Sequence, residues 1–549
     1  MRRSWSVVLL VGGLAIPASL YLPWKNAACG PGCFGGQAGT VSGLLNLFAG
    51  GSTLHGWSSG IGEIAALAGL LLAAVAAAAV ARPSLAHRLP LGLCAMLAGY
   101  FALAVAAQSR SLADARDLGT TGIDLEFHWG YGAYLGVAAA VAVLLVAGAA
   151  RRRDLMRVGS ISGVAAVVLS LGLLVAFLLP WERRTTQAPI TSLGIASPAA
   201  VVAASIAISL LSVWWGRSQF ARAARPLLSG AALLFTAAAF SSVGFFSGAR
   251  AYGAWVGLGA AIAITVLALT DGVPLPRVRP SWFAVATGAA AALLIAALFL
   301  PWQQVCFGRG FGSPLSERCL STNGWTSPAG SVAALLAIAL AAVAFRAKPL
   351  AALGVEPAAG LALFIATLGL QIDHSSEQGV TAGFGSGAPI GFVAAGILIL
   401  LAVVRCRPTD VDWQRLLIRL APLVVCLAYL AVVAVQWWNV FPPFRSSAWR
   451  FAPLSWLTIA GALLAIWLIG LWVDRIQDES RDPRVLVLIP LALLALATVD
   501  LVRLRENGFS WGRGGVVGFC LLLAALGRVE QQQGLEGFRV PAIFRVDRL

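Results

Sequence analysis

The sequence predicts an all-α, polytopic integral membrane protein of about sixteen transmembrane helices, arranged as four tandem four-helix repeats. Hydrophobic residues make up 59% of the 549 residues and charged residues only 11%, and the mean hydropathy is +0.85. Soluble domains average about 45–50% apolar and about 25% charged residues. Apolar stretches of about 20 residues, the length that crosses a bilayer, recur along the chain. The same composition excludes a disordered chain, which lacks such apolar surface.

The predicted spans follow one another through short connections. The first span comes directly after Arg2 and Arg3, a pattern that also fits a cleaved signal peptide. It ends in Leu22-Pro23-Trp24, however, and the same ending recurs at later spans where no cleavage can occur, so we expect a retained helix. The spans cover approximately residues 5–22, 60–80, 89–107, 131–150, 160–179, 196–215, 226–244, 252–270, 282–300, 327–345, 351–370, 387–404, 417–437, 453–473, 484–502 and 512–528.

The placement of basic residues predicts which span ends face the cytoplasm. With the N-terminus inside, the cytoplasmic segments hold 26 of the 39 Lys and Arg residues, including Arg151, Arg152 and Arg153. Basic residues of short loops stay on the cytoplasmic side, so both termini are expected there. The net charge of +16 is therefore interpreted as a topology signal rather than a nucleic-acid site. Only two basic residues are lysine, a bias typical of GC-rich bacterial genomes, and we expect a bacterial cytoplasmic membrane.

Three short motifs recur and predict internal repeats. Leu-Pro-Trp closes the first span of a unit, a Gly-Trp or Ser-Pro-Ala segment precedes the second span, and two glycines four residues apart begin the fourth. The first glycines of successive copies are 121, 134 and 127 residues apart. The Leu-Pro-Trp copies occupy residues 22–24, 179–181 and 300–302, and the glycine pairs are Gly132 and Gly136, Gly253 and Gly257, Gly387 and Gly391, and Gly514 and Gly518.

These motifs divide the chain into four units of four spans. The units are residues 1–155, 156–279, 280–412 and 413–549, the last including a short cytoplasmic tail. Because each unit has an even number of spans, all four share one orientation, unlike the inverted repeats common in secondary transporters. Glycines four residues apart allow helix backbones to approach closely in lipid, so we expect tight helix packing near the outer end of each unit. In the fourth unit, Gln436-Trp437-Trp438 replaces Leu-Pro-Trp.

Tryptophan is expected to mark the membrane boundary. Twelve of the 19 tryptophans fall at outer span boundaries. Proline ends the first helix, because the residue before it is driven out of the helical region, and the indole then suits the headgroup level. We expect interface anchors at Trp24, Trp57, Trp181, Trp302 and Trp325. The alternative is an outer platform that holds a partner.

The first unit combines the outer Leu-Pro-Trp with Cys29 and Cys33 in the following loop and Glu126-Phe127 before the fourth span. In this layout it resembles the claudin and PMP22 class of four-helix membrane proteins, and the third unit repeats the pattern with Cys306 and Cys319. The Gly-Leu-Trp segment that accompanies the cysteines in claudins is absent here. The resemblance implies the four-helix arrangement only, with no junction-forming or pore function.

The eight cysteines divide by side of the membrane. Cys29, Cys33, Cys306 and Cys319 fall in predicted outer loops, where disulfides persist. We expect Cys29–Cys33 and Cys306–Cys319 bridges, with a zinc site as the alternative at Cys29-x3-Cys33. The others are expected to be packing residues.

Glu63 is the candidate functional residue within the membrane. Charged side chains in the hydrocarbon region are costly and are functional candidates by default. Glu63 lies six residues past Trp57, about 9 Å of helix rise, and aligning the units places it opposite Val201 and Ser331. A hydrogen-bonded or protonated carboxyl within the bundle is one interpretation, and a proton- or cation-coupled role or a lipid-headgroup contact are the others.

Other polar chemistry is sparse. His55, Glu126 and His128 lie in outer loops of the first unit and could converge on a metal, although loop histidines are usually solvated. The sequence contains no Gly-rich phosphate loop, zinc-protease motif or nucleophile elbow. We therefore expect no catalytic residues, no resident metal and no cofactor.

The sequence favours a non-catalytic membrane subunit or scaffold that presents a Trp-rich outer surface to lipids or partner proteins. The features shared by the four copies are structural, and polar residues within the spans are few. The alternative is a secondary transporter or lipid-handling carrier that uses Glu63. An envelope enzyme would need a catalytic constellation that the sequence does not contain.

Overall fold

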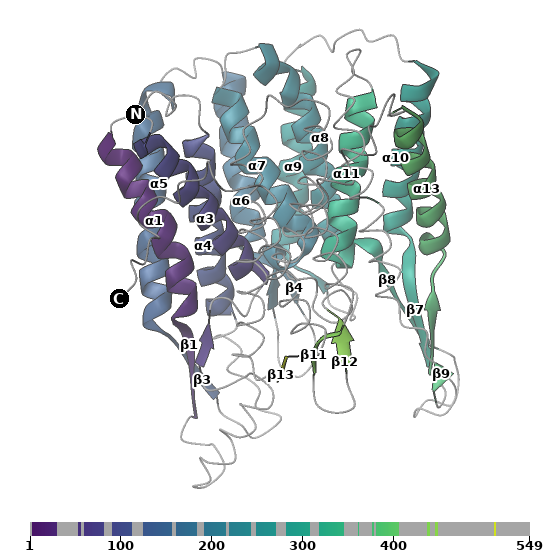
Figure 1. Ribbon diagram of the computed structural model, residues 1–549, viewed down its shortest axis with the longest axis horizontal. Helices are drawn as coiled ribbons and strands as arrows, with labels where there is room; N and C mark the ends of the chain where they lie inside the picture. Colours follow the sequence, from purple (N-terminus) through teal and green to yellow (C-terminus); the bar gives the residue numbers. More distant parts are fainter. Residues whose placement is uncertain are drawn as a thin grey trace, which may run out of the picture. The chain divides into compact units, whose positions relative to one another are not determined.

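The computed structural model describes the backbone of 17 segments of the chain (Figure 1). They are residues 3–29, 53–55, 60–81, 90–111, 125–155, 161–183, 191–215, 219–242, 249–270, 281–307, 318–344, 361, 376–377, 380–405, 436–439, 445–447 and 510–511. Within these residues, seven helices are long and apolar enough to cross a membrane, and four further apolar helices are slightly shorter. The described part of the chain is mostly helical, as predicted. The other predicted spans lie outside the described residues.

The first four described helices form a closed bundle. α1 (Arg3–Tyr21) packs against α3 (Gly60–Ala81) and α5 (Tyr131–Leu155), and α4 (Leu91–Ser111) packs against α3 and α5. Gly13 and Gly69 allow the backbones of α1 and α3 to touch, since a Cβ on Gly13 would lie 2.9 Å from the Gly69 carbonyl oxygen. Small residues are the expected device for helix contact in lipid.

The next four helices repeat this arrangement. α6 (Ile161–Phe177) packs against α7 (Pro198–Trp215) and α9 (Tyr252–Thr270), and α8 (Gln219–Ser242) packs against α7 and α9. The two bundles meet where α4 packs against α7. α4 also reaches α6, where the Tyr100 hydroxyl donates a hydrogen bond of 3.0 Å to the Leu174 carbonyl. That carbonyl is one of the last four of α6, which have no partner within their own helix.

Three more helices follow. They are α10 (Trp282–Phe299), α11 (Pro328–Ala344) and α13 (Gly387–Arg405). The chain divides into two compact units. Unit 1 comprises residues 1–279, 295–331 and 372–391, and therefore holds both complete bundles together with the ends of α10, α11 and α13 nearest their strands. Unit 2 comprises residues 280–294, 332–371 and 392–549. The proposed repeat boundaries at 155, 279 and 412 stay predictions.

Small antiparallel sheets are present that the sequence analysis did not predict. Their strands are β1 (Pro23–Cys29), β2 (Thr53–His55), β3 (Leu125–Trp129), β4 (Pro180–Arg183), β5 (Thr191–Leu193), β6 (Ala249–Arg250), β7 (Pro301–Phe307), β8 (Arg318–Asn323), β9 (Ser376–Glu377), β10 (Val380–Phe384), β11 (Gln436–Asn439), β12 (Arg445–Ser447) and β13 (Ser510–Trp511). The segments were expected to be outer loops of an all-α protein. The prediction of a purely α-helical chain was therefore incomplete.

All four sheets share one strand order. In the first three sheets, β2-β1-β3, β5-β4-β6 and β8-β7-β10-β9, the strand after the first helix lies between the strands that precede the second and fourth helices. The fourth sheet, β12-β11-β13, likewise has its first strand along the chain in the middle. Each central strand carries a bulge just after its first residue, at Pro23, Pro180, Pro301 and Gln436. In compact unit 1 (residues 1–279, 295–331 and 372–391), the strands lie at one end of the helices (Figure 1), which we call the sheet end.

The residue pairing between strands shows that the fourth sheet is built like the other three. The residue after the tryptophan of each central strand pairs with the third strand, at Lys25↔Trp129, Glu182↔Arg250, Gln303↔Phe384 and Trp438↔Trp511. Each of those partners precedes the first glycine of a predicted pair by three residues. Gln436 and Trp437 therefore hold the backbone positions that Pro-Trp holds elsewhere.

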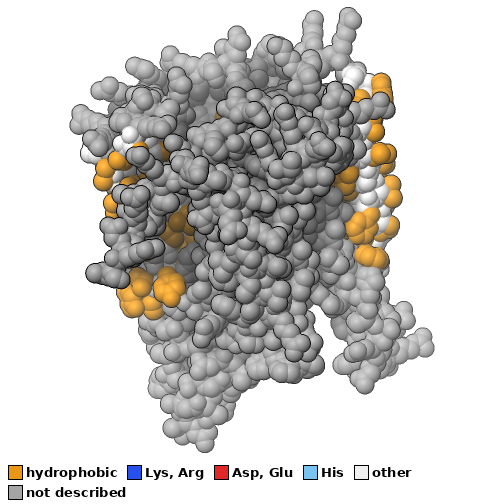
Figure 2. All heavy atoms as spheres, in the orientation of Figure 1, with side chains coloured by type: hydrophobic (Ala, Val, Ile, Leu, Met, Phe, Trp, Pro, Cys, Tyr) orange, Lys and Arg blue, Asp and Glu red, His pale blue; other side chains and the backbone are white. Residues whose placement is uncertain are grey.

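The helices bury mainly alanine against one another and expose larger aliphatic side chains. α1 exposes Val7, Val11 and Leu14, whereas Leu9, Ile16 and Leu20 are fully buried. Among the described side chains of the face in Figure 2, hydrophobic groups are visible along the helices. A hydrophobic exterior over the length of a helix suits a lipid environment rather than water.

Candidate functional site

The tryptophan that follows the first helix is buried in each of the three repeats whose first helix the structure describes. Trp24, Trp181 and Trp302 are 1%, 0% and 3% exposed. Each indole Nε1–H donates to the backbone carbonyl five residues earlier, at Ser19 (2.6 Å), Ala176 (2.8 Å) and Ala297 (2.8 Å). These carbonyls lie in the last turn of α1, α6 and α10. Each carbonyl also accepts from the backbone amide three residues later, at Leu22, Leu179 and Leu300 (3.1 Å each), so the indole is its second donor. The buried N–H group thereby gains the acceptor that it needs.

The glycine pairs lie directly against these indoles. A Cβ on Gly257 would lie 2.8 Å from Trp181 Cζ2, and one on Gly136 or Gly391 would overlap the ring of Trp24 or Trp302. The first glycine of each pair touches the residues just before the tryptophan, since a Cβ on Gly132 would lie 2.7 Å from the Ser19 carbonyl oxygen. The glycines thus make room for an indole rather than only for a neighbouring backbone.

A backbone hydrogen bond completes each contact. The carbonyl of Trp24, Trp181 or Trp302 accepts from the amide of the residue that follows the third strand, namely Gly130 (2.9 Å), Ala251 (2.8 Å) and Gly385 (2.8 Å). We call the combination of buried indole, glycine pair and backbone bond the tryptophan–glycine junction. It joins the end of the first helix to the start of the fourth, at the sheet end of unit 1 (Figure 1).

The burial of these tryptophans corrects their expected role. Trp24, Trp181 and Trp302 were expected to face lipid headgroups, but a side chain that is almost fully enclosed by protein cannot anchor there. Trp325 is also enclosed, at 0% exposure. The Leu-Pro-Trp pattern predicts the helix end, but the pattern alone does not reveal that the following strand turns the indole back onto the bundle. Trp57 lies outside the described residues.

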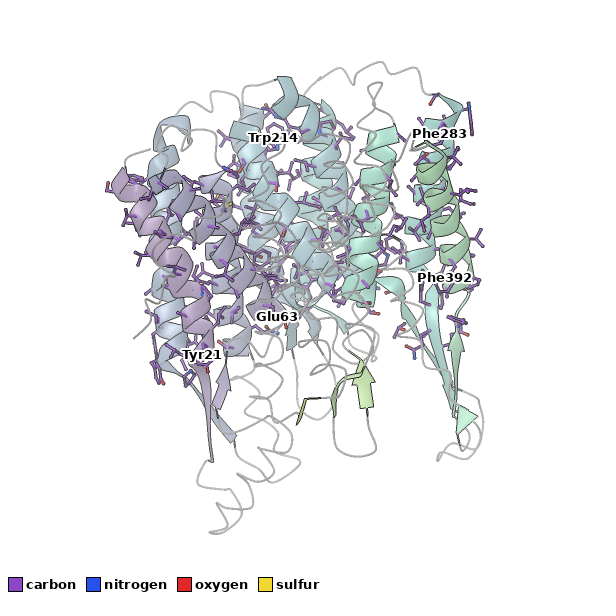
Figure 3. All side chains as sticks on the ribbon, in the orientation of Figure 1. Tyr21, Glu63, Trp214, Phe283 and Phe392 are labelled. Carbon is purple, nitrogen blue, oxygen red and sulfur yellow. The ribbon has the colours of Figure 1, made fainter. Side chains whose placement is uncertain are left out.

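Other aromatic residues face outward at the sheet end; of these, the sequence had placed only Trp255 at an outer span boundary. We call them the aromatic rim: Tyr21 (55% exposed), Tyr131 (62%), Tyr134 (62%), Tyr252 (60%), Trp255 (58%) and Phe384 (50%). Figure 3 labels Tyr21 at the end of α1, beside the strands. Exposed Tyr and Trp at helix ends are typical of a membrane–water interface. The rim could have been predicted from the aromatic residues that flank Gly132 and Gly253 in the sequence.

Trp325 lies in a short 3₁₀ turn, η5 (Gly324–Thr326), just before α11. Its ring contacts Phe235 of α8 at 5.6 Å and Phe299 of α10 at 5.2 Å between centroids. The preceding Asn323 donates from Nδ2 to Ser241 Oγ at the end of α8, at 3.4 Å. The equivalent turn η4 (Gly194–Ala196) buries Ile195 and contacts α3. In both places, the turn before a second helix packs on the preceding bundle.

Glu63 lies in the first turn of α3 and is only 1% exposed (Figure 3). A carboxylate in the first turn is favoured by the positive end of the helix dipole. The equivalent positions in the next two units, Val201 and Ser331, are also buried. The carboxyl group is therefore peculiar to Glu63 among these three equivalent positions, and it lies at the sheet end rather than at the middle of α3.

The candidate metal ligands of the first unit do not converge. β2 and β3 flank opposite sides of β1, with His55 opposite Pro23 and Glu126 opposite Ala28. Five residues of β1 separate those two positions, about 16 Å at 3.3 Å per residue. A single ion cannot be held across that separation. Among the described residues, no group of three His, Cys, Asp or Glu side chains is placed to bind a metal.

The cysteines expected to form disulfides are placed unequally. Cys306 and Cys319 are register partners on β7 and β8. Cys29 is the last residue of β1 and pairs with Leu125, whereas Cys33 lies outside the described residues. Gly514 and Gly518 also lie outside them.

Comparison with known proteins adds no further assignment. No protein-family model, curated protein or solved structure matches the chain.

Proposed function

We propose that the chain is a non-catalytic membrane subunit or scaffold, built from four tandem four-helix units that share one orientation. The observation that carries this proposal is the tryptophan–glycine junction, which recurs with the same hydrogen bonds and the same glycine contacts at Trp24, Trp181 and Trp302. The repeated features stabilise a rigid framework. The polar residues differ from copy to copy, as Glu63, Val201 and Ser331 illustrate.

The surface offered to lipids or partner proteins is the sheet end with its aromatic rim. Its exposed tyrosines and tryptophan present apolar rings together with polar O–H and N–H groups, a combination suited to both headgroups and protein interfaces. The strands of unit 1 lie at the helix ends and supply backbone edges. We place this end outside a bacterial cytoplasmic membrane and both termini in the cytoplasm, because the basic residues gather at the opposite helix ends.

The test of a scaffold is a partner that depends on the rim. The protein is purified from its native membranes in mild detergent, and its mass is measured by native mass spectrometry. We expect a stoichiometric partner that is lost when Tyr252→Ser and Trp255→Ser are combined. Trp282→Ser is the control, because Trp282 is also well exposed (76%) but lies at the end of α10 away from its strand. A protein that always purifies alone contradicts the scaffold.

A transporter is the second candidate, and the burial of Glu63 favours it. A buried carboxyl within an apolar helix can take up and release a proton during transport. The protein is reconstituted in proteoliposomes, and the decay of an imposed pH gradient is followed with a trapped pH-sensitive dye. Transport predicts a flux that Glu63→Gln abolishes and that Glu182→Gln, on β4, leaves intact. If the wild-type protein and the Glu63→Gln variant give the same flux, a proton-coupled transport function of Glu63 is excluded.

A further inference from the structure

The β7–β8 hairpin places two cysteines directly across from each other. Cys306 and Cys319 are Cα partners in an antiparallel ladder that runs from Pro301↔Asn323 to Phe307↔Arg318. Directly opposite residues in such a ladder have Cα atoms about 4.5 or 5.5 Å apart. A disulfide needs a Cα separation of about 4.4–6.8 Å. The backbone therefore satisfies the distance requirement of a bridge without any rearrangement.

We propose that Cys306 and Cys319 form a structural disulfide that closes this hairpin. The two thiols are oxidised by exchange with a protein disulfide of the outer compartment. The S–S bond between Cys306 and Cys319 forms as the S–S bond of the partner disulfide breaks, and the two electrons and two protons lost by the thiols pass to the partner, which becomes two thiols. The inference rests on the outward orientation of the sheet end given above, since disulfides persist in oxidising compartments and are rare in the cytosol.

The hairpin occupies a position where such a bridge has a structural consequence. β7 begins at the residue before Trp302 and is the central strand of its sheet, and β8 leads directly into η5. The bridge therefore links the strand that carries a tryptophan–glycine junction to the turn that packs Trp325 on Phe235. Closing a loop of this kind restricts the unfolded chain and so stabilises the folded one.

The first unit provides an internal comparison. Cys29 ends β1 and pairs with Leu125 rather than with a cysteine, so its strand register offers no cross-strand bridge. The inference is therefore made for Cys306 and Cys319 alone. The buried Cys94 of α4 is a free thiol and serves as a reference.

The test is thiol counting on the full-length protein purified from membranes without reductant. Denatured protein is alkylated before and after reduction and analysed by peptide mass spectrometry. We expect the peptides containing Cys306 and Cys319 to be joined before reduction and separately alkylated after it. Cys306→Ser should make Cys319 alkylatable without reductant, and Cys319→Ser should do the same for Cys306. Cys94→Ser should leave the bridge unchanged.

Two results would overturn the proposal. Free alkylation of both thiols in the unreduced wild-type protein excludes the bridge, and a peptide joining Cys306 or Cys319 to another cysteine excludes this pairing. A stability measurement distinguishes a structural bridge from an incidental one: reduction should lower the melting temperature of the wild-type protein but not that of the Cys306→Ser, Cys319→Ser double variant. Impermeant-label accessibility of the sheet end, measured separately, reports whether the orientation holds even if the thiols are free.

Discussion

At the scale of single residues, the tryptophan–glycine junction explains why the same few residue types recur. An indole can fill the space above the end of the first helix only where the facing helix has no Cβ, and its N–H then needs an acceptor once it is buried. Gly257 and the carbonyl of Ala176 meet both needs for Trp181. The sequence identified the glycines and the tryptophan separately. It could not show that they form one contact, because 76 residues separate Trp181 from Gly257.

Substitution of the second glycine tests this contact. A Cβ on Gly257 would meet Trp181, whereas one on Gly259 of the same helix would meet nothing within 4 Å. We expect Gly257→Ala to lower the free energy of unfolding by about 1–3 kcal/mol through overpacking. Gly259→Ala should leave it unchanged or raise it slightly, because alanine favours a helix more than glycine does. Thermal unfolding in nanodiscs measures both, and equal effects of the two substitutions would argue against the junction.

The indole hydrogen bond can be tested in the same way. Trp181→Phe keeps an aromatic ring but removes one of the two donors of the Ala176 carbonyl, which retains the Leu179 amide. We expect a cost of about 0.5–1.5 kcal/mol, the net value of one hydrogen bond. Trp325 is equally buried, yet its Nε1 has no hydrogen-bond partner among the described residues. Trp325→Phe should therefore cost less than Trp181→Phe. The reverse order in a comparison of melting temperatures would contradict the role assigned to the N–H group.

At the scale of elements, the sequence predicted helices well and strands not at all. Apolar runs long enough to span a bilayer are unmistakable, and α1, α3, α4 and α5 lie close to the predicted spans at 5–22, 60–80, 89–107 and 131–150. The strands are short, and two of them, β6 and β13, contain only two residues. They have no alternating pattern to detect, and their pairing joins segments that are far apart along the chain.

The register of the fourth sheet gives a prediction for the fourth unit. Trp437 holds the position of Trp24, whereas Trp438 holds that of Lys25. We expect Trp437→Ala and Gly518→Val to destabilise the protein by similar amounts, and their combination to cost less than the sum, because both disrupt one contact. Trp438→Ala should have a smaller effect. Additive losses from Trp437→Ala and Gly518→Val, measured by thermal unfolding, would indicate that the two residues do not touch.

At the scale of the whole molecule, the account depends on every sheet facing the same side of a membrane. The proposed even number of spans in each repeat requires this, and basic residues such as Arg151, Arg152 and Arg153 belong to the opposite helix ends. The number of spans and the placement of basic residues do not depend on which substrate or partner the protein binds. Packing and topology follow from residue type and spacing, whereas recognition depends on side chains that differ from one unit to the next.

Labelling at the two ends of one helix tests the orientation. Tyr252 and Thr270 are exposed at the first and last residues of α9, about 27 Å apart at 1.5 Å per residue. In a background without native cysteines, an impermeant maleimide added to intact spheroplasts should label Tyr252→Cys. Thr270→Cys should react only after permeabilisation. Labelling of Thr270→Cys alone in intact spheroplasts would reverse the proposed topology.

The most direct test of the fourfold architecture is a cryo-EM structure of the protein in a lipid nanodisc. The account predicts that Trp437 is buried against Gly514 and Gly518, with the fourth sheet on the same side of the bilayer as the other three. A map in which the Trp437 side chain faces lipid, or in which the helix after β13 lies away from β11, would contradict the tandem arrangement.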